Sequence, residues 1–371
     1  MNGTLASMDI VDSTRSFERW LGKHLRLRRD DLRYKHELMA ADTFSFLRAT
    51  FYRWAQLWPE ALPDLAQAPR VLAVGDLHVE NYGTWRDAEG RLVWGMNDFD
   101  EATRLPFTAD LVRLATSAGL AAAEGHLNID LKQACSAILA GYSASIRAGG
   151  KPMVLAEKDR WLRKMASGRL RDPIVFWPQI HALPTARGIS GSPAQALLMQ
   201  RLPDGADRVR LARRRSGLGS LGCERLVAIA DWHGADTAHE AKALAPSAWE
   251  WAHGDHGTGR ILYLDLAAAA VRCPDPMIDV REGWLIRRLS PDCSRIELDS
   301  LPRPRDEARL LKAMGWEAGN IHLGTRGAGA AIQSDLKRRR SGWLREAATK
   351  MGRLVRADWK AWRATEQKAA E

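Results

Sequence analysis

The sequence predicts a mixed α+β fold with two lobes, and three observations indicate it. Helical periodicity dominates residues 14–58 and the region from about residue 304 onward. Short apolar runs typical of strands occupy residues 71–74 and 92–96. A glycine-rich loop at residues 217–222 stands between two further strand-like segments. A chain of 371 residues is long enough for two domains or for one large two-lobed unit.

The composition predicts a cytoplasmic globular protein. Apolar residues make up 46% and charged residues 27%, which is usual for such domains. No apolar run reaches the length that spans a bilayer, and residues 1–12 lack the features of a signal peptide, so we expect no membrane partner. The four cysteines are widely spaced without metal-ligand spacing, which predicts reduced thiols.

The net charge of +10 favours anionic ligands such as nucleotides or nucleic acid. Basic side chains gather at residues 208–215 and 337–363, and the second segment also carries Trp343, Trp359 and Trp362. Cations interleaved with tryptophans suit phosphate contact and base stacking. The plainer interpretation, which we favour, is an amphipathic helix whose apolar face covers a core.

Two acidic motifs follow the strand-like runs at 71–74 and 92–96. The first is Gly-Asp-Leu-His-Val-Glu-Asn at residues 75–81, and the second is Asn-Asp-Phe-Asp-Glu at residues 97–101. The stretch between them predicts a hairpin with its turn at residues 87–90, which would bring Asp76, Asn81 and Asp98 to one end. Carboxylate and amide oxygens gathered in this way suit Mg²⁺. The alternative is two acidic turns stabilised by Asx-type hydrogen bonds.

The spacing of these motifs is typical of phosphoryl transfer, in which an Asp orients the hydroxyl while an Asn five residues later and a separate Asp hold the metal. The segment resembles the phosphotransferase side of the protein-kinase-like superfamily, as in aminoglycoside and choline kinases, although Val74 replaces their usual His. The resemblance implies that Asp76 is the catalytic base, that His78 orients its loop, and that Asn81 and Asp98 bind Mg²⁺. Asp100 or Glu101 would bind a second metal ion or cap the following segment.

The glycine-rich loop precedes a strand-like segment at residues 224–230, whereas a dinucleotide-binding loop needs a helix there. Glycines between two strands, with a Lys on the next strand, describe the phosphate-covering loop of a kinase. This interpretation assigns nucleotide binding, with ATP as the cofactor, to Gly217, Gly219, Ser220, Gly222 and Lys242. An ordinary glycine-rich hairpin is the alternative.

The order of these parts is reversed relative to kinases, because the acidic motifs precede the glycine-rich loop. Circular permutation of a two-lobed kinase-like fold would explain this order. We therefore expect a helical catalytic lobe at residues 1–150, a connecting segment at 151–204, a β-rich nucleotide lobe at 205–300 and basic helices at 301–371 that pack on the catalytic lobe.

A closer resemblance rests on residues 39–46, Arg48, and residues 75–83, 97–101 and 110–117. Together they resemble the bacterial domain-of-unknown-function family 2252, strongly over residues 35–145 and more weakly beyond. The family has Lys-Glu-Ala where this chain has Lys-Ala-Leu at 242–244, and its Ala-Arg-Ala-His-Ala-like run is degenerate at 317–322.

We therefore expect an ATP- and Mg²⁺-dependent phosphotransferase acting on an unknown hydroxyl of a small molecule or protein. Asp110 would either buttress the loop of Asp76 or cap its own helix. Arg48 and Arg113 would contact phosphate or, as we favour, pair with the acidic cluster. Alternative functions are a catalytically inactive kinase-like module, a nucleic-acid-binding module or a metal-dependent hydrolase.

Overall fold

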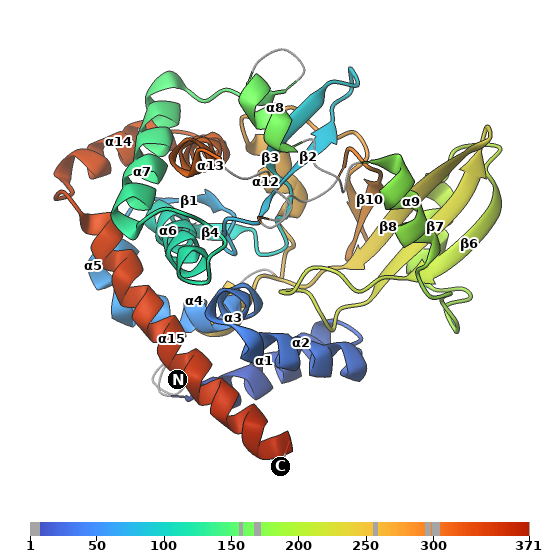
Figure 1. The fold of residues 1–371 in the computed structure, drawn as a ribbon, viewed down its shortest axis with the longest axis horizontal. Coiled ribbons are helices and arrows are strands. Elements are labelled where there is room, and N and C mark those ends of the chain that lie inside the picture. The colour runs from blue at the N-terminus through green and yellow to red at the C-terminus, as the bar shows by residue number, and fades with distance from the viewer. Residues whose placement is uncertain are drawn as a thin grey trace.

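The computed structural model describes residues 8–155, 159–166, 172–254, 259–293, 298 and 305–370. It is a mixed α+β structure, as the sequence predicts, with a helical body on one side and an antiparallel sheet on the other (Figure 1). No helix in these ranges is long and apolar enough to cross a bilayer. All four cysteines are free thiols.

The N-terminal region forms a run of short helices, as its periodicity predicts. These are α1 (Ile10–His24), α2 (Arg29–Ala41), α3 (Thr43–Ala49), α4 (Phe51–Ala61) and α5 (Pro63–Ala66). Asp42 separates α2 from α3 because its carboxylate accepts a hydrogen bond from Ser45 N at 2.6 Å, which caps α3. The apolar faces of α1, α3 and α4 enter the main core.

Short strands frame both acidic motifs. β2 (Tyr82–Arg86) and β3 (Leu92–Met96) form the expected hairpin, and β5 (Met153–Val154) extends it. The turn forms where predicted, because Asp87 O accepts from Gly90 N at 2.9 Å. β1 (Arg70–Ala73), which precedes the first motif, pairs instead with β4 (Thr103–Pro106). Asp76 therefore reaches the hairpin end from the connection between two different sheets.

Five further strands form an antiparallel sheet in the order β6-β7-β8-β10-β9. Their bounds are β6 (Asp207–Arg213), β7 (Arg225–Trp232), β8 (Ala235–Ala243), β9 (Asp279–Arg281) and β10 (Trp284–Leu289). The glycine-rich loop joins the first two strands, and Lys242 lies on the third, as expected. The sequence also predicts a hairpin about residues 281–283, and β9 and β10 form it.

Two helices cover the outer part of this sheet. α10 (Pro193–Arg201) packs on the face formed by Leu226, Ala228 and Ile286, and α9 (Pro173–His181) packs near Val227 and Ile229 on the other face. Side chains alternate between the two faces along a strand. The α9 face therefore also carries three charged residues at the end of the sheet nearer the helical body: Arg225, Glu240 and Lys242. That end of the sheet therefore presents charged rather than apolar side chains to the body.

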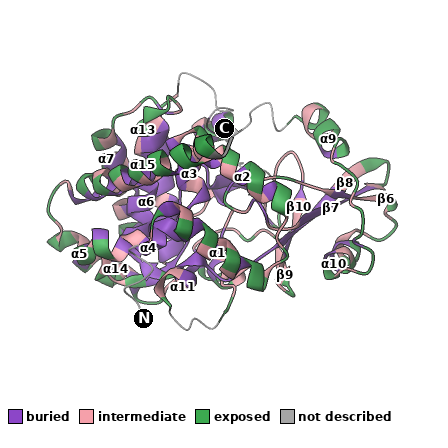
Figure 2. Cartoon of the chain, turned by 90° about the horizontal axis from the view of Figure 1, so that it is seen from below, coloured by how far each residue is buried: buried purple, intermediate pink, exposed green. Residues whose placement is uncertain are grey.

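The helical body is built around α6 (Phe107–Ala123), which is buried along most of its length (Figure 2). α7 (Leu131–Ala148) packs closely on α13 (Glu307–His322) because glycines stand at their crossing. A Cβ atom on Gly141 would overlap the carbonyl of Lys312, and one on Gly315 would overlap that of Ile138. These glycines let the two backbones touch.

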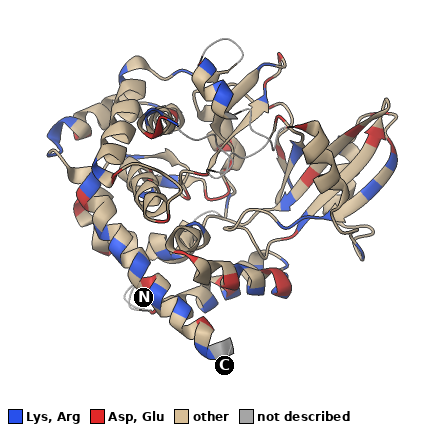
Figure 3. Cartoon of the chain, viewed as in Figure 1, with Lys and Arg blue, Asp and Glu red and all other residues tan. Residues whose placement is uncertain are grey.

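The basic C-terminal region covers the core. It comprises α14 (Ala328–Arg338) and α15 (Trp343–Ala370), and Lys and Arg positions recur along both helices (Figure 3). Trp343 and Trp362 are buried, and the indole N–H groups of Trp359 and Trp362 donate to the carbonyls of Ala40 and His36 at 3.3 and 3.2 Å. The plainer interpretation of this segment is therefore confirmed.

The remaining helices are α8 (Arg160–Ala166), α11 (Ala248–His253) and α12 (Tyr263–Ala269). The sequence predicts a helix over residues 258–272, and the structure shows a shorter one there, because α12 begins at Tyr263 and ends at Ala269. The first residue of the expected helix, at 258, lies outside the described residues. α11 was not anticipated from the sequence.

Candidate functional site

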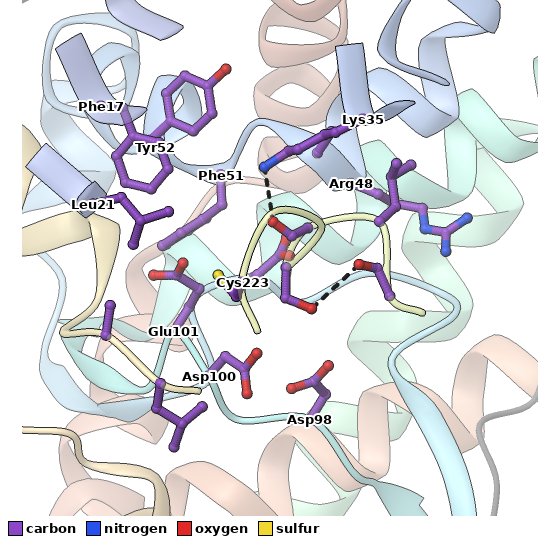
Figure 4. A pocket seen from close by; sticks show the side chains of 18 of the residues that line it. Phe17, Leu21, Lys35, Arg48, Phe51, Tyr52, Asp98, Asp100, Glu101 and Cys223 are labelled. Carbon is purple, nitrogen blue, oxygen red and sulfur yellow. Dashed lines mark hydrogen bonds between the residues drawn. The ribbon is translucent and has the colours of Figure 1, made fainter. Parts of the chain in front are cut away.

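A cavity of about 90 Å³ lies between the helical body and the glycine-rich loop. Most of the predicted site residues line it: Asp76, His78, Asn81, Asp98, Asp100, Gly217, Gly219 and Ser220. Gly222 and Lys242 do not. Its apolar wall includes Leu21, Phe51 and Leu244. Segments that are distant in sequence thus meet at one cavity (Figure 4).

Asp110 accepts hydrogen bonds from the start of the aspartate loop, residues 75–81. This carboxylate is fully buried and accepts hydrogen bonds from Val74 N at 2.8 Å and Gly75 N at 2.9 Å. The buttressing role is confirmed and the capping alternative is wrong, because Asp110 lies inside α6, which begins at Phe107. Gly75 has a φ of +80°, and a Cβ there would lie 2.5 Å from the Glu101 carbonyl, so only glycine fits.

A second layer of buried polar groups supports Asp110. His322 Nε2 lies 3.1 Å from its carboxylate, and the hydroxyl of Tyr142 lies 2.8 Å from His322 Nδ1. His322 belongs to the run at 317–322 that looked degenerate in sequence. His322 thus helps to position Asp110, a role that the degenerate run at residues 317–322 did not predict.

Asp76 is paired with a buried arginine. Arg113 Nε donates to Asp76 Oδ1 at 2.9 Å, and the same guanidinium donates to the carbonyl of Leu47. Burial raises the pKa of Asp76, and Arg113 opposes that rise. Arg48 pairs with Glu80 at 2.7 Å, so the prediction that both arginines pair with acidic residues is confirmed.

Two oxygen atoms of the site have unused hydrogen-bonding capacity. Asn81 Nδ2 donates to the backbone carbonyl of Asp76 at 3.1 Å, while Asn81 Oδ1 is buried and has no partner among the described residues. Asp100 Oδ1 is likewise buried and has no hydrogen-bond partner among the described residues. A buried acceptor without a donor is costly, so both atoms would gain from a cation or a donor supplied by a ligand.

The carboxylates of the second motif are paired with a buried lysine. Lys242 Nζ contacts Asp98 Oδ1 at 3.4 Å and forms a closer ion pair with Asp100. Burial opposes ionisation of Asp98, but Lys242 and the nearby Arg287 outweigh it and hold the pKa of Asp98 below its usual range. Burial, together with the charge of Asp98, raises the pKa of Asp100.

Three or more His, Cys, Asp or Glu side chains do not come together as a metal cage anywhere in the described ranges. Such a cage is not required for Mg²⁺, which is usually held by one or two carboxylates together with water and substrate phosphates. Glu101 is occupied elsewhere, because it accepts from Ala248 N at 2.7 Å and so caps α11. Burial raises the pKa of Glu101 to about 7.

The glycine-rich loop is docked on α2 and its preceding residues. Arg28 N donates to the Gly222 carbonyl at 2.9 Å, and a Cβ on Gly222 would overlap Leu32. Gly222 therefore packs against α2 instead of facing the cavity, which corrects its predicted role. The amides of Ser220 and Leu221 already donate within the loop, so fewer backbone donors face the cavity than expected.

Two groups of site residues were missed in the sequence. Lys35 on α2 is buried, lines the cavity and donates to the Gly219 carbonyl at 2.9 Å. Glu240 is fully buried on β8 and binds Arg214, Arg225 and Arg287 at 2.7–2.8 Å. Arg225 also donates to Ser220 Oγ at 2.9 Å, which ties the loop to the sheet. Arg214 lies in the basic run at residues 208–215, but Lys35 and Glu240 belong to no local motif, so sequence spacing carries no signal for them.

The fold and cavity define a mixed α+β protein whose acidic motifs and glycine-rich loop meet at one site. Residues 27–172 match the family model described as "Uncharacterized protein conserved in bacteria (DUF2252)", so this segment of the chain is similar to that family. The match includes both acidic motifs and Lys35, while the glycine-rich loop and Lys242 lie beyond it. Neither the curated proteins nor the solved structures gave a significant match.

Proposed function

We propose that this protein is an ATP- and Mg²⁺-dependent phosphotransferase of the kinase-like type, acting on a hydroxyl of a small molecule or protein. The observation that carries the proposal is the orientation of Asn81. Its Nδ2 is held by the Asp76 carbonyl, which leaves the buried Oδ1 as the ligand atom. A fixed amide oxygen at the end of the first acidic motif, lining the same cavity as Asp98 of the second, is what a metal site for phosphoryl transfer requires.

In this proposal Asp76 orients the acceptor hydroxyl. Its Oδ1 is held by Arg113, and its Oδ2 lies toward the glycine-rich loop, since a Cβ on Gly219 would be 3.4 Å from it. Asn81 Oδ1 and Asp98 would hold Mg²⁺, whose role is to bridge phosphate oxygens and neutralise their charge. The low pKa of Asp98 keeps its carboxylate ionised for this purpose.

The arrangement of the loop and Lys242 supports a circularly permuted kinase-like fold. Residues 217–222 follow the acidic motifs in sequence, yet Gly219 lies close to Asp76. Lys242 stands on β8, the second strand after the loop, and its ion pairs with Asp98 and Asp100 bring it to the proposed metal site. This matches the kinase plan, in which a lysine on the third strand reaches the phosphates.

The docked loop forms part of the cavity wall, and Lys35, Arg28 and Leu32 hold it against α2. In this proposal nucleotide binding displaces the loop, a change of the kind that often accompanies catalysis in enzymes with lids.

One observation favours a second candidate, a catalytically inactive kinase-like module. Lys242 neutralises the carboxylates that would bind Mg²⁺, and a permanent pairing would leave no metal site. Nucleic-acid binding has less support than the sequence gave it, because Trp343 and Trp362 are buried against the body and are not available for stacking.

The first test measures nucleotide-dependent stability. Mg²⁺ with ATP should raise the free energy of unfolding by about 2.7 kcal/mol at a hundredfold excess over its dissociation constant. Asp98→Asn should remove the Mg²⁺-dependent part of this gain. Asp64→Asn, at an exposed acidic residue of α5, is the matched control and should behave as wild type. Absence of any shift with millimolar nucleotides would contradict the proposal.

The second test separates turnover from binding. Asp76→Asn keeps a hydrogen-bonding group beside Arg113, and it should retain nucleotide binding while losing roughly 10²–10⁴-fold in rate. ATP hydrolysis or autophosphorylation, followed with γ-labelled ATP, can report turnover before the acceptor is known. A wild-type protein that binds Mg²⁺ and ATP but transfers no label would favour the inactive module.

A further inference from the structure

Lys35 is a buried cation with no counterion among the residues that the structure describes. Only 4% of the residue is exposed, and its Nζ donates to the Gly219 carbonyl at 2.9 Å. Across the part of the chain that the structure describes, no carboxylate lies within 4.0 Å of that Nζ. The other buried cations of the site differ, because Lys242 and Arg113 each contact an Asp.

Such an arrangement is unfavourable by itself. An ammonium group has three N–H donors, and a single carbonyl neither satisfies them nor balances the charge. Burial lowers the pKa of Lys35, and more distant acidic groups such as Glu18 and Glu101 only partly offset that effect. An anion bound in the cavity would supply the missing partner.

We propose that Lys35 binds the phosphate chain of the nucleotide, close to the phosphoryl group that is transferred. This inference rests on the proposed function and identifies a ligand-binding residue outside the acidic and glycine motifs. Lys35 lines the cavity and points toward the loop (Figure 4). It is bonded to Gly219, the loop residue that lies against Asp76.

Other groups at the site that could donate hydrogen bonds to a phosphate already have partners. Lys242 is bound by Asp98 and Asp100 and does not line the cavity. The amides of Ser220 and Leu221 donate within the loop. Arg48 also lines the cavity, but it is paired with Glu80 at 2.7 Å. Lys35 is therefore a cavity-lining cation that has no acidic partner among the described residues to give up when a phosphate binds.

The exchange also accounts for how the loop opens. A phosphate oxygen is a stronger acceptor for an ammonium group than a neutral carbonyl, because charge-assisted hydrogen bonds are about twice as strong. When phosphate replaces the Gly219 carbonyl as the partner of Lys35, one of the contacts that holds the loop on α2 is lost. Binding and loop release are then the same event at Lys35.

Calorimetric titration of the full-length chain tests the proposal. The ligands are ATP with Mg²⁺, inorganic tripolyphosphate and adenosine, and the variants are Lys35→Met and Lys35→Gln. Gln removes the charge but keeps a donor for the Gly219 carbonyl, whereas Met removes both. Lys23→Met, at an exposed lysine near the end of α1, is the matched control.

Both Lys35 variants should weaken binding of ATP and tripolyphosphate by roughly tenfold to a hundredfold, as expected for one charged hydrogen bond. Adenosine binding should be unchanged, and Lys23→Met should match wild type. Without ligand, Lys35→Met should be at least as thermally stable as wild type, since it removes an uncompensated buried charge.

The outcomes distinguish the two proposals. Wild-type ATP affinity in both Lys35 variants would overturn the role of Lys35 and leave the phosphotransferase proposal standing. Binding of tripolyphosphate but not ATP to wild type, with loss in the variants, would support the anion site and contradict the nucleotide. If wild type binds neither ligand, both proposals fail. A large loss of stability in Lys35→Met with unchanged ligand affinity would show that Lys35 only fastens the loop.

Discussion

Replacing Asp110 by Ala should destabilise the protein far more than removing a helix cap would. Asp110 accepts hydrogen bonds from Val74 N and Gly75 N in a fully buried setting. Each buried amide left without an acceptor costs about 1–3 kcal/mol, so the two together cost about 2–6 kcal/mol. Loss of the contact with His322 adds to this. The effect is a large part of a typical unfolding free energy of about 5–15 kcal/mol.

The assay is urea unfolding of Asp110→Ala and Asp110→Asn against wild type, with the free energies extrapolated to water. Asparagine keeps one acceptor oxygen, so its cost should be about half that of alanine. Asp130→Ala is the control, because Asp130 caps α7 from an exposed position and its loss should cost about 1 kcal/mol. If Asp110→Ala costs no more than Asp130→Ala, the buttressing argument is refuted.

Two further predictions concern packing and pH. Gly141→Ala should destabilise by about 1–3 kcal/mol or more in thermal unfolding, because the added Cβ overlaps the Lys312 carbonyl and forces α7 away from α13. Gly352→Ala, where a Cβ meets only ordinary contacts, should be neutral or stabilising, and equal effects would contradict the packing argument. Burial raises the pKa of Glu317 to about 7, so its folded form binds a proton that the unfolded form releases above about pH 4.5. The free energy of unfolding should therefore fall by about 3 kcal/mol through this group as pH rises from about 4.5 to 7. Glu317→Gln cannot ionise, so urea unfolding of this variant at successive pH values should lack that part of the fall. An unchanged pH dependence in the variant would count against the shifted pKa.

Much of the site was predictable because its chemistry is concentrated in short segments. Asp76 and Asn81 are five residues apart, and the turn at residues 87–90 is short enough for local rules to identify. The family match over residues 27–172 agrees with the resemblance carried by these motifs. The kinase-like activity stays a prediction, since the matched family is described only as uncharacterized.

The sequence by itself determined the local elements: the helical N-terminal and C-terminal regions, the hairpin between the acidic motifs, and the glycine-rich loop between two strands, with Lys242 on the strand after those two. Local periodicity and turn residues act over a few positions, so they are visible in one chain. Only the tertiary structure decided that Lys35 bonds to Gly219, 184 residues away, and that His322 supports Asp110 from a distance of 212 residues. It also decided that Lys242 pairs with Asp98 and Asp100. The physical reason is that burial and charge pairing depend on which surfaces pack together, and residue spacing along the chain does not encode that.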